Sequence, residues 1–191
     1  MGLMVPLSAG ALLIANPELP DPNFDQTVVL ILAHGDDGSL GVVLNRPGPL
    51  TAAERVSAWH PALVGDGVIF AGGPVNPDVV VGLAVRAPGV TGPLPEGLMT
   101  EVFADVGIVD LENPHDDAWR MLCCLRVFAG YAGWGPGQLA AEVAAGGWWV
   151  VEARPDDVSS ERPLSLWRNV LRRQAGSLAL VSSYSRTPEL N

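Results

Sequence analysis

Short apolar runs separated by proline and glycine constrain the fold of this sequence more than any other feature. The 191 residues include 17 prolines and 22 glycines, so few apolar stretches continue for long. Runs of roughly four to eight residues that are rich in branched apolar side chains and bounded by turn residues are typical of buried strands. Such runs occupy residues 11–16, 26–34, 40–47, 68–75, 79–85, 101–110 and 148–153. The sequence therefore predicts a sheet of many short strands.

Four other segments have the features of short helices: residues 51–59, 114–128, 136–147 and 164–176. The first opens on a hydroxyl residue with Glu54 three positions later, which is a capping-box pattern. The second has Asn113 as its N-cap and Pro114 at its first helical position. In the last, the helical period predicts one buried face formed by Leu164, Trp167, Val170 and Leu171. The prolines and glycines of residues 86–99 predict an irregular loop between elements.

The segment from His34 to Pro47 has the pattern of a hairpin. An Asp-Gly step between two apolar runs favours a tight turn, so Asp36 and Asp37 are assigned to that turn. His34 and Arg46 close the two arms, and we expect them to lie near one another if the register runs straight. The Arg46 guanidinium needs acceptors because it ends a buried strand. It is either a clamp that ties the strand to a loop or a receptor for an anion at a pocket mouth.

Residues 133–137 form a glycine-rich loop ahead of a predicted helix, where free backbone amides can hold an anion. Three features count against a nucleotide site. Gln138 replaces the third glycine of the dinucleotide-binding pattern, Pro136 lacks an amide hydrogen, and the loop follows a predicted helix rather than a strand. A tight corner between two helices is the favoured interpretation, and nucleotide binding is the alternative.

The residue types exclude several kinds of chemistry. All eleven basic residues are arginines, which removes Schiff-base chemistry and every lysine general base. No serine has the GxSxG context of a hydrolase elbow. Neither a metal nor a cofactor is predicted, because no spacing puts two ligands on one face among His34, His60 and His115. The adjacent Cys123 and Cys124 fall in a predicted helix and are expected to be reduced packing residues.

The formal net charge of −10 disfavours nucleic acid as a partner, because a polyanion meets net repulsion. The basic group formed by Arg162, Arg168, Arg172 and Arg173 is predicted to be a solvated helix face instead. No apolar run reaches the roughly 18 to 20 residues that span a bilayer, and the first residues lack the pattern of a signal peptide. We therefore expect a cytoplasmic protein without a membrane partner.

Five ordered motifs resemble those of the bacterial AlgH/YqgE family. They read GALLIANPELPDPNFDQTVVLILAH, GSLGVVLNRP, VIFAGGPV, FAGYAGWGPGQLAAEV and WWVV, and together they extend over most of the chain. The sequence departs from the family at Gln26, where an arginine is usual, and at Ala141, where an acidic residue is common. The loop at residues 86–99 is also individual.

The resemblance implies an α+β fold in which a mixed sheet bends into a partly closed barrel with a group of roughly four helices packed around it. The length predicts a single domain over residues 1–191, with a core from about residue 8 to 181 and a loosely ordered C-terminal tail. Members are mostly uncharacterised and one carries the label of a transcriptional regulator, so the resemblance transfers fold rather than function. The characteristic positions of the family here are His34, Asn45, Arg46, Pro47, Gly72, Gly73, Pro74, Tyr131, Gly133, Trp134, Gly137 and Gln138.

The leading hypothesis is a non-catalytic regulatory or small-ligand-binding protein, since no nucleophile can be paired with a base. Its candidate pocket consists of His34, Asn45, Arg46, Gly72, Gly73, Trp134 and Gln138. The competing hypothesis is an enzyme, a hydrolase of a phosphorylated or acidic small molecule. It needs His34 as acid and base and Arg46 as anion holder in one cleft. The expected partner is a small molecule or a protein, and the chain is expected to be a monomer or a weak homodimer.

Overall fold

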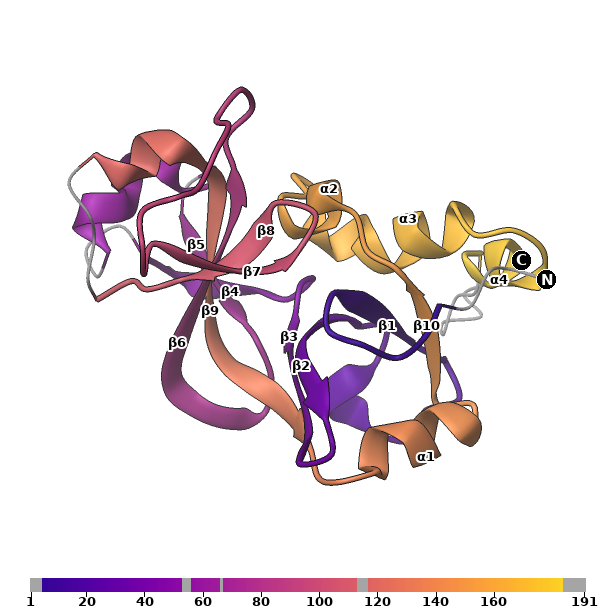
Figure 1. The fold of residues 1–191 in the computed structure, drawn as a ribbon. Coiled ribbons are helices and arrows are strands. Elements are labelled where there is room, and N and C mark those ends of the chain that lie inside the picture. Colours follow the sequence, from indigo (N-terminus) through magenta and orange to yellow (C-terminus); the bar gives the residue numbers. More distant parts are fainter. Residues whose placement is uncertain (1–4, 53–55, 66, 113–116, 184–191) are drawn as a thin grey trace.

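The computed structural model describes residues 5–52, 56–65, 67–112 and 117–183. In these ranges ten strands form one strongly curled sheet with four α-helices packed around it, as the resemblance implied (Figure 1). The strands are β1 (Ala11–Ala15), β2 (Val28–Gly35), β3 (Gly38–Val43), β4 (Pro47–Thr51), β5 (Val68–Ala71), β6 (Val75–Arg86), β7 (Met99–Phe103), β8 (Val106–Val109), β9 (Leu122–Trp134) and β10 (Trp148–Glu152). The α-helices are α1 (Gln138–Ala144), α2 (Pro155–Val158), α3 (Leu166–Arg172) and α4 (Ser177–Val181). The 3-10 helices are η1 (Pro22–Phe24), η2 (Ser57–Ala62), η3 (Ala118–Met121) and η4 (Pro163–Ser165).

The strand order is β10-β1-β2-β3-β9-β6-β8-β7, and β4 joins the sheet through β5, which pairs with β9. Neighbouring strands are antiparallel except β5 and β9, which run parallel with Phe70 opposite Phe128. β6 follows one edge of β9, while β5 and then β3 occupy successive stretches of its other edge. β9 therefore joins the two halves of the sheet.

Most of the segment expected to form a helix at residues 114–128 is the first half of β9. Residues 113–116 lie outside the described residues, one 3-10 helix follows as η3, and the strand begins at Leu122. Val127 and Phe128 are buried and have strand partners on both edges. Sheet pairing of β-branched and aromatic residues outweighs a weak local preference for helix. The helix prediction was wrong for this reason.

Two expected strands differ in extent from the structure. Residues 101–110 form the hairpin of β7 and β8 rather than one strand, and Ala104 and Asp105 turn it with positive φ angles. The strands expected at residues 68–75 and 79–85 are divided differently, because β6 runs without a break from Val75 to Arg86. This is possible because its register with β9 is irregular near Pro77, so that Pro77 has no ladder partner to lose.

The helix expected at residues 51–59 is not formed as predicted. Thr51 ends β4, Glu54 lies outside the described residues, and the helical turn η2 begins only at Ser57. The shorter helices predicted at residues 136–147 and 164–176 are confirmed as α1 and α3. No helix in the described ranges is long and apolar enough to span a membrane.

Strand β1 is buried on both faces because helices cover both. On one face Leu12 and Ile14 belong to a core that includes Trp167 of α3. On the other face Leu13 packs in a core with Leu139 of α1. Figure 1 shows α1 and α3 on opposite sides of β1 and β10. Successive residues of a strand point to opposite faces, so a short run of apolar residues supplies both cores.

The predicted apolar face of α3 is confirmed except at its first residue. Trp167, Val170 and Leu171 are buried, whereas Leu164 is 78% exposed. Leu164 falls in the 3-10 helix η4 that precedes α3. Because a 3-10 helix has three residues per turn, it does not continue the face of the α-helix that follows.

Buried polar contacts hold the C-terminal helices to the sheet. The indole of Trp167 donates to the carbonyl of Ala15 at 2.9 Å. Asp157 is 3% exposed and accepts from the two terminal nitrogens of Arg173 at 2.6 and 2.7 Å, and from the Arg154 amide at 2.8 Å. Arg173 was predicted to be part of a solvated face, which is wrong because Asp157 binds it. The other members of that group, Arg162, Arg168 and Arg172, are exposed.

Substitution Asp157→Ala should destabilise the protein strongly, because it leaves a half-buried guanidinium and a backbone amide without their acceptor. We expect the free energy of unfolding to fall by about 2–4 kcal/mol, measured by urea denaturation. The control Asp156→Ala removes the same charge from an exposed neighbour in α2 and should change stability by less than about 1 kcal/mol. Equal losses in the two variants would contradict the structural role of Asp157.

Candidate functional site

A pocket of about 550 Å³ opens between the loop before η1, the end of β9 and helix α1. Two of the predicted site residues, Trp134 and Gln138, line it, and so does Pro74. The other side chains that define its chemistry are Glu18, Asp21, Phe24 and Glu142. We call this cavity the Trp134 pocket.

The carboxylate of Glu142 organises one wall of the Trp134 pocket. Its Oε2 accepts hydrogen bonds from the indoles of Trp134 at 3.0 Å and Trp148 at 2.9 Å. Its Oε1 accepts from the amide group of Gln138 at 2.9 Å. Gln138 and Glu142 are four residues apart in α1, and this spacing places them on one helix face. A carboxylate has about four lone-pair positions, so one stays open.

Three aromatic rings pack together behind this wall. Phe24 stacks on Trp134 with ring centroids 6.1 Å apart, and it meets the edge of Trp148 at 5.2 Å. The two indoles are 6.0 Å apart in an edge-to-face arrangement. Offset and edge-to-face pairs are the preferred geometries of aromatic rings. Phe24 and Trp134 line the pocket with the small part of each side chain that stays exposed, 9% and 6%.

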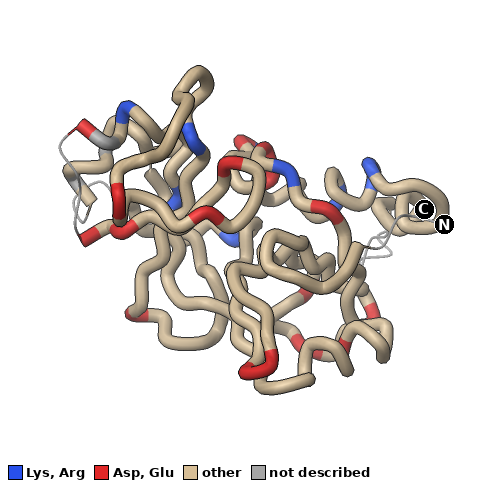
Figure 2. Tube along the Cα trace, viewed as in Figure 1, with Lys and Arg blue, Asp and Glu red and all other residues tan. Residues whose placement is uncertain are grey.

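The Trp134 pocket is electrostatically negative. Three carboxylates line it, Glu18, Asp21 and Glu142, and no arginine of the described residues does. In Figure 2 the part of the molecule around α1 and the β2–β3 turn, at the bottom of the view, carries acidic segments only. This environment repels an acidic or phosphorylated ligand and attracts a cation.

The glycine-rich loop at residues 133–137 is a strand-to-helix turn. It follows β9, so the expectation that it follows a helix and forms a helix-to-helix corner was wrong. Gly137 has a φ of 70° and is the N-cap of α1. The amide of Gly135 donates to the Gln138 side chain at 3.0 Å. One of the amides that an anion would use is therefore already occupied by the protein itself.

Asn45 and Arg46 tie β3 to the start of β2 and do not line the Trp134 pocket. Asn45 is buried, accepts from the Val28 amide at 2.9 Å and donates to the Gln26 carbonyl at 2.9 Å. Arg46 donates to the Asp25 carbonyl at 3.3 Å. This contact favours the clamp over the anion receptor, the two alternatives that the sequence left open for Arg46.

His34 and Arg46 lie at opposite ends of the β2–β3 hairpin. His34 pairs with Ser39 beside the turn, and their side chains are 2.7 Å apart. Arg46 follows the far end of β3, about 20 Å away at the ordinary rise of a strand. The expectation that they lie near one another was wrong, because the turn at residues 35–38 places His34 at the tip of the hairpin and not at its base. The shared cleft that the hydrolase hypothesis requires is therefore not formed.

Gly72 and Gly73 lie where β5 meets β9. A Cβ atom on Gly72 would collide with the Gly130 carbonyl oxygen, and one on Gly73 would collide with the Tyr131 carbonyl group. The Gly72 amide donates to Ala129 at 2.8 Å, and its carbonyl accepts from the Val43 amide at 2.8 Å. These two glycines allow the backbones of three strands to approach, and they lie outside the lining of the pocket.

Sequence reasoning missed the acidic side chains of the pocket. Glu142 has a readable signal, because Gln138 four residues earlier puts both side chains on one face of the predicted helix. Glu18 and Asp21 lie in the proline-rich segment between the predicted strands at residues 11–16 and 26–34. Nothing in the local sequence shows that this loop faces Trp134. Within the described ranges, no three His, Cys, Asp or Glu side chains are grouped so as to hold a metal ion.

Comparison with known proteins agrees with the fold. A family described as AlgH-like, DUF179, matches residues 12–179. The chain belongs to this family. AlgH-like relatives include a UPF0301 protein of Streptomyces coelicolor, 49% identical over 95% of this chain and 94% of that protein. A UPF0301 protein of Streptomyces avermitilis is 50% identical with the same coverage.

Two solved structures share this AlgH-like fold. The crystal structure of protein DIP2367 from Corynebacterium diphtheriae has a TM-score of 0.87 and 30% identity, covering 94% of each chain. The solution structure of the AlgH protein from Pseudomonas aeruginosa has a TM-score of 0.63 and 24% identity, covering 98% of this chain and all of that one. At that identity the second structure supports the fold alone.

Substitution Gly72→Ala should destabilise the protein, because its Cβ would press against the backbone of β9. We expect a loss of about 1–3 kcal/mol in the free energy of unfolding, measured by chemical denaturation. Gly35→Ala is the matched control, since a Cβ there meets nothing within 4 Å. A Gly72→Ala protein as stable as the Gly35→Ala protein would contradict the close approach of these strands.

Proposed function

We propose that this protein is a non-catalytic ligand-binding protein whose Trp134 pocket takes a small organic cation. One observation carries the proposal: three carboxylates and two aromatic rings line the pocket, and no basic side chain in the described part of the chain does. A volume of about 550 Å³ lies within the usual range for small-molecule sites. The separation of His34 from Arg46 argues against the hydrolase alternative, which needs both side chains in one cleft.

The aromatic surface and the carboxylates would act on different parts of such a ligand. A cation over the face of an indole or phenyl ring gains about 0.5–2 kcal/mol, depending on how far it is desolvated. Phe24 and Trp134, which both line the pocket, would supply that aromatic contact. The free lone pair of Glu142, together with Glu18 and Asp21, would attract the positive group from solution.

The chemistry of Glu142 also explains why the pocket is preformed. Its carboxylate is held by two indoles and one amide, so binding a ligand need not order it. A preorganised receptor loses less conformational entropy when the ligand binds. The same contacts make the indole N–H groups of Trp134 and Trp148 direct reporters of the pocket.

Nuclear magnetic resonance of these indole N–H groups tests the proposal. Titration with choline, putrescine and agmatine should shift the signals of Trp134 and Trp148 with at least one of the three. The signal of Trp167 should stay in place, because its indole is bound to Ala15 in the other core. The neutral alcohol 3,3-dimethylbutan-1-ol has the shape of choline without its charge and should shift neither reporter. No shift with any cation at millimolar concentration would overturn the proposal.

A pair of double variants separates a specific site from the general negative charge of the protein. Glu18→Gln with Asp21→Asn should weaken binding by at least about fivefold, because it removes two charges from the pocket. The substitution Asp21→Asn keeps a side-chain oxygen that can accept from the Asn23 amide, as Asp21 does. The control, Glu96→Gln with Glu101→Gln, removes two exposed charges elsewhere and should leave affinity unchanged. Equal weakening by both pairs would contradict the proposal.

A further inference from the structure

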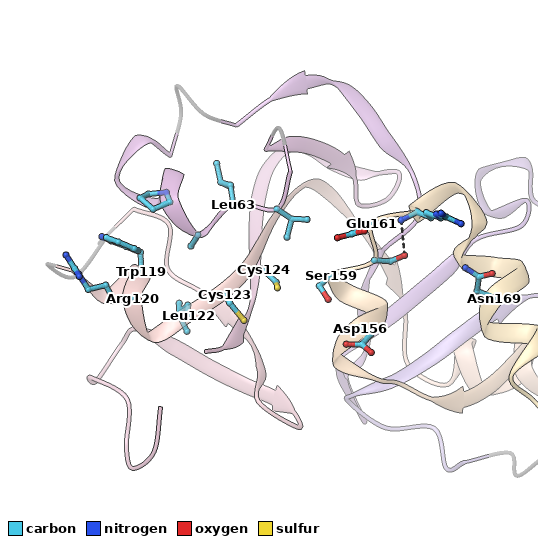
Figure 3. Close-up of a pocket in the computed structure, with 15 residues that line it drawn as sticks. Leu63, Trp119, Arg120, Leu122, Cys123, Cys124, Asp156, Ser159, Glu161 and Asn169 are labelled. Carbon is cyan, nitrogen blue, oxygen red and sulfur yellow. Dashed lines mark hydrogen bonds between the residues drawn. The ribbon is translucent and has the colours of Figure 1, made fainter. Parts of the chain in front are cut away.

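A second cavity lies at the other end of β9, between that strand, the turns η2 and η3, and the segment that joins α2 to η4. Its volume is about 820 Å³, and Cys123 and Cys124 line it together with Ser159 and Ser160. Figure 3 shows both cysteine side chains projecting from β9 toward the segment that carries Ser159. We call this cavity the dithiol cleft. The Trp134 pocket and its proposed ligand take no part in it.

The backbone at Cys124 explains why two adjacent cysteines reach one cavity. Neighbouring residues of a regular strand point to opposite faces. Cys124 has a φ of 59°, and the register between β6 and β9 shifts at this point. A left-handed residue other than glycine in a strand is uncommon and is found most often at functional or tightly constrained positions. Here it turns both thiols to the same side, where both are half-buried and reduced.

Arg126 adds a buried positive charge beside these thiols. It is 4% exposed, its guanidinium lies 4.7 Å from the centroid of the Phe70 ring, and it donates to the Ser160 carbonyl. Its Nε and Nη1 atoms have no hydrogen-bond partner in the described part of the chain. Burial lowers the pKa of Arg126 to about 10, and the charge of Cys124 acts in the opposite direction. A guanidinium near a cysteine attracts its anionic form.

The two thiols are not equivalent. Burial is the main cause that raises the pKa of Cys123 to about 11, and a hydrogen bond to Cys124 and the charge of Cys124 contribute. Cys123 therefore keeps its proton at neutral pH, and its thiol donates to the Arg86 carbonyl at 3.8 Å. Of the pair, Cys124 is the sulfur whose charge interacts with the buried guanidinium of Arg126, and this contact favours it as the nucleophile.

We propose that Cys123 and Cys124 form a redox-active dithiol in which Cys124 attacks a hydroperoxide and Cys123 resolves the product. The Cys124 sulfur attacks one peroxide oxygen, the O–O bond breaks, and the other oxygen leaves as water or an alcohol after taking a proton. Cys124 is then a sulfenic acid. The Cys123 sulfur attacks the Cys124 sulfur and expels hydroxide, which takes the Cys123 proton and leaves as water. The product is a disulfide, which an external thiol reduces.

The cleft suits a small neutral oxidant. Its charged lining side chains balance, with Asp156 and Glu161 against Arg120 and Arg162. Neither an anionic nor a cationic peroxide is favoured by that balance. Ring closure between adjacent cysteines also requires the backbone at Cys124 to adjust, because the Cα atoms across a trans peptide are about 3.8 Å apart and disulfides usually need at least about 4.4 Å. The redox state is thereby linked to the irregular backbone of β9.

Mass spectrometry of the full-length reduced protein tests the proposal. One equivalent of hydrogen peroxide should remove two hydrogen atoms from the wild-type protein, and dithiothreitol should restore them. Cys123→Ser should accumulate a sulfenic acid at Cys124 that dimedone traps. Cys124→Ser should oxidise at least about tenfold more slowly than the wild type.

Two results would overturn the inference. One is a Cys124→Ser protein that oxidises as fast as the wild type. The other is a wild-type protein that keeps both thiols while reduced glutathione in the same tube is oxidised. A further pair addresses Arg126 as a positioning residue: Arg126→Met should slow oxidation severalfold, whereas Arg120→Met, at the exposed rim of the cleft, should not. If Arg126→Met does not fold, the two cysteine variants still decide the question.

Discussion

Hydrogen bonding on both edges of β9 is the constraint on which the rest of the structure depends. β6 pairs along one edge, while β5 and β3 share the other in succession, one parallel and one antiparallel. The three strands β3, β5 and β6 can all pair with β9 only where their backbones approach one another closely. Gly72 and Gly73 permit that approach, since a side chain at either position would collide with β9. The curled sheet, with both of its halves, follows from this junction.

The same strand positions both cavities. Trp134 lies at the C-terminal end of β9 and lines the acidic pocket. After the turn that follows, Glu142 of α1 accepts a hydrogen bond from the Trp134 indole. Near the N-terminal end of β9, the irregular backbone at Cys124 directs the side chains of Cys123 and Cys124 toward the dithiol cleft. Phe128, between these ends, is buried in the sheet core.

Local patterns predicted the parts of the fold whose stabilising contacts are near in sequence. Nearby residues define the short strands, the helix after Gly137 and the amphipathic helix around Trp167. In each case the bounding turn residues and the spacing of apolar residues can be read within the segment itself. The predictions failed where distant pairing decides. The first half of β9 has helix-capping residues ahead of it, but its partners in β5 and β6 lie 36 or more residues away in the chain. Trp134 and Gln138 were predicted as site residues, whereas the acidic character of their pocket depends on a loop more than 100 residues earlier.

The sequence by itself determined the residue types available for chemistry: arginine as the only strong base, a large excess of carboxylates, and two adjacent cysteines. It also determined the family motifs and the run of short strands. Only the tertiary structure decided which of these groups meet. His34 and Arg46 are close in sequence, yet the hairpin turn separates them, whereas Glu18 and Glu142 are distant in sequence and line one pocket. Strand register and sheet curl set these distances, and both arise from pairings between segments far apart in the chain.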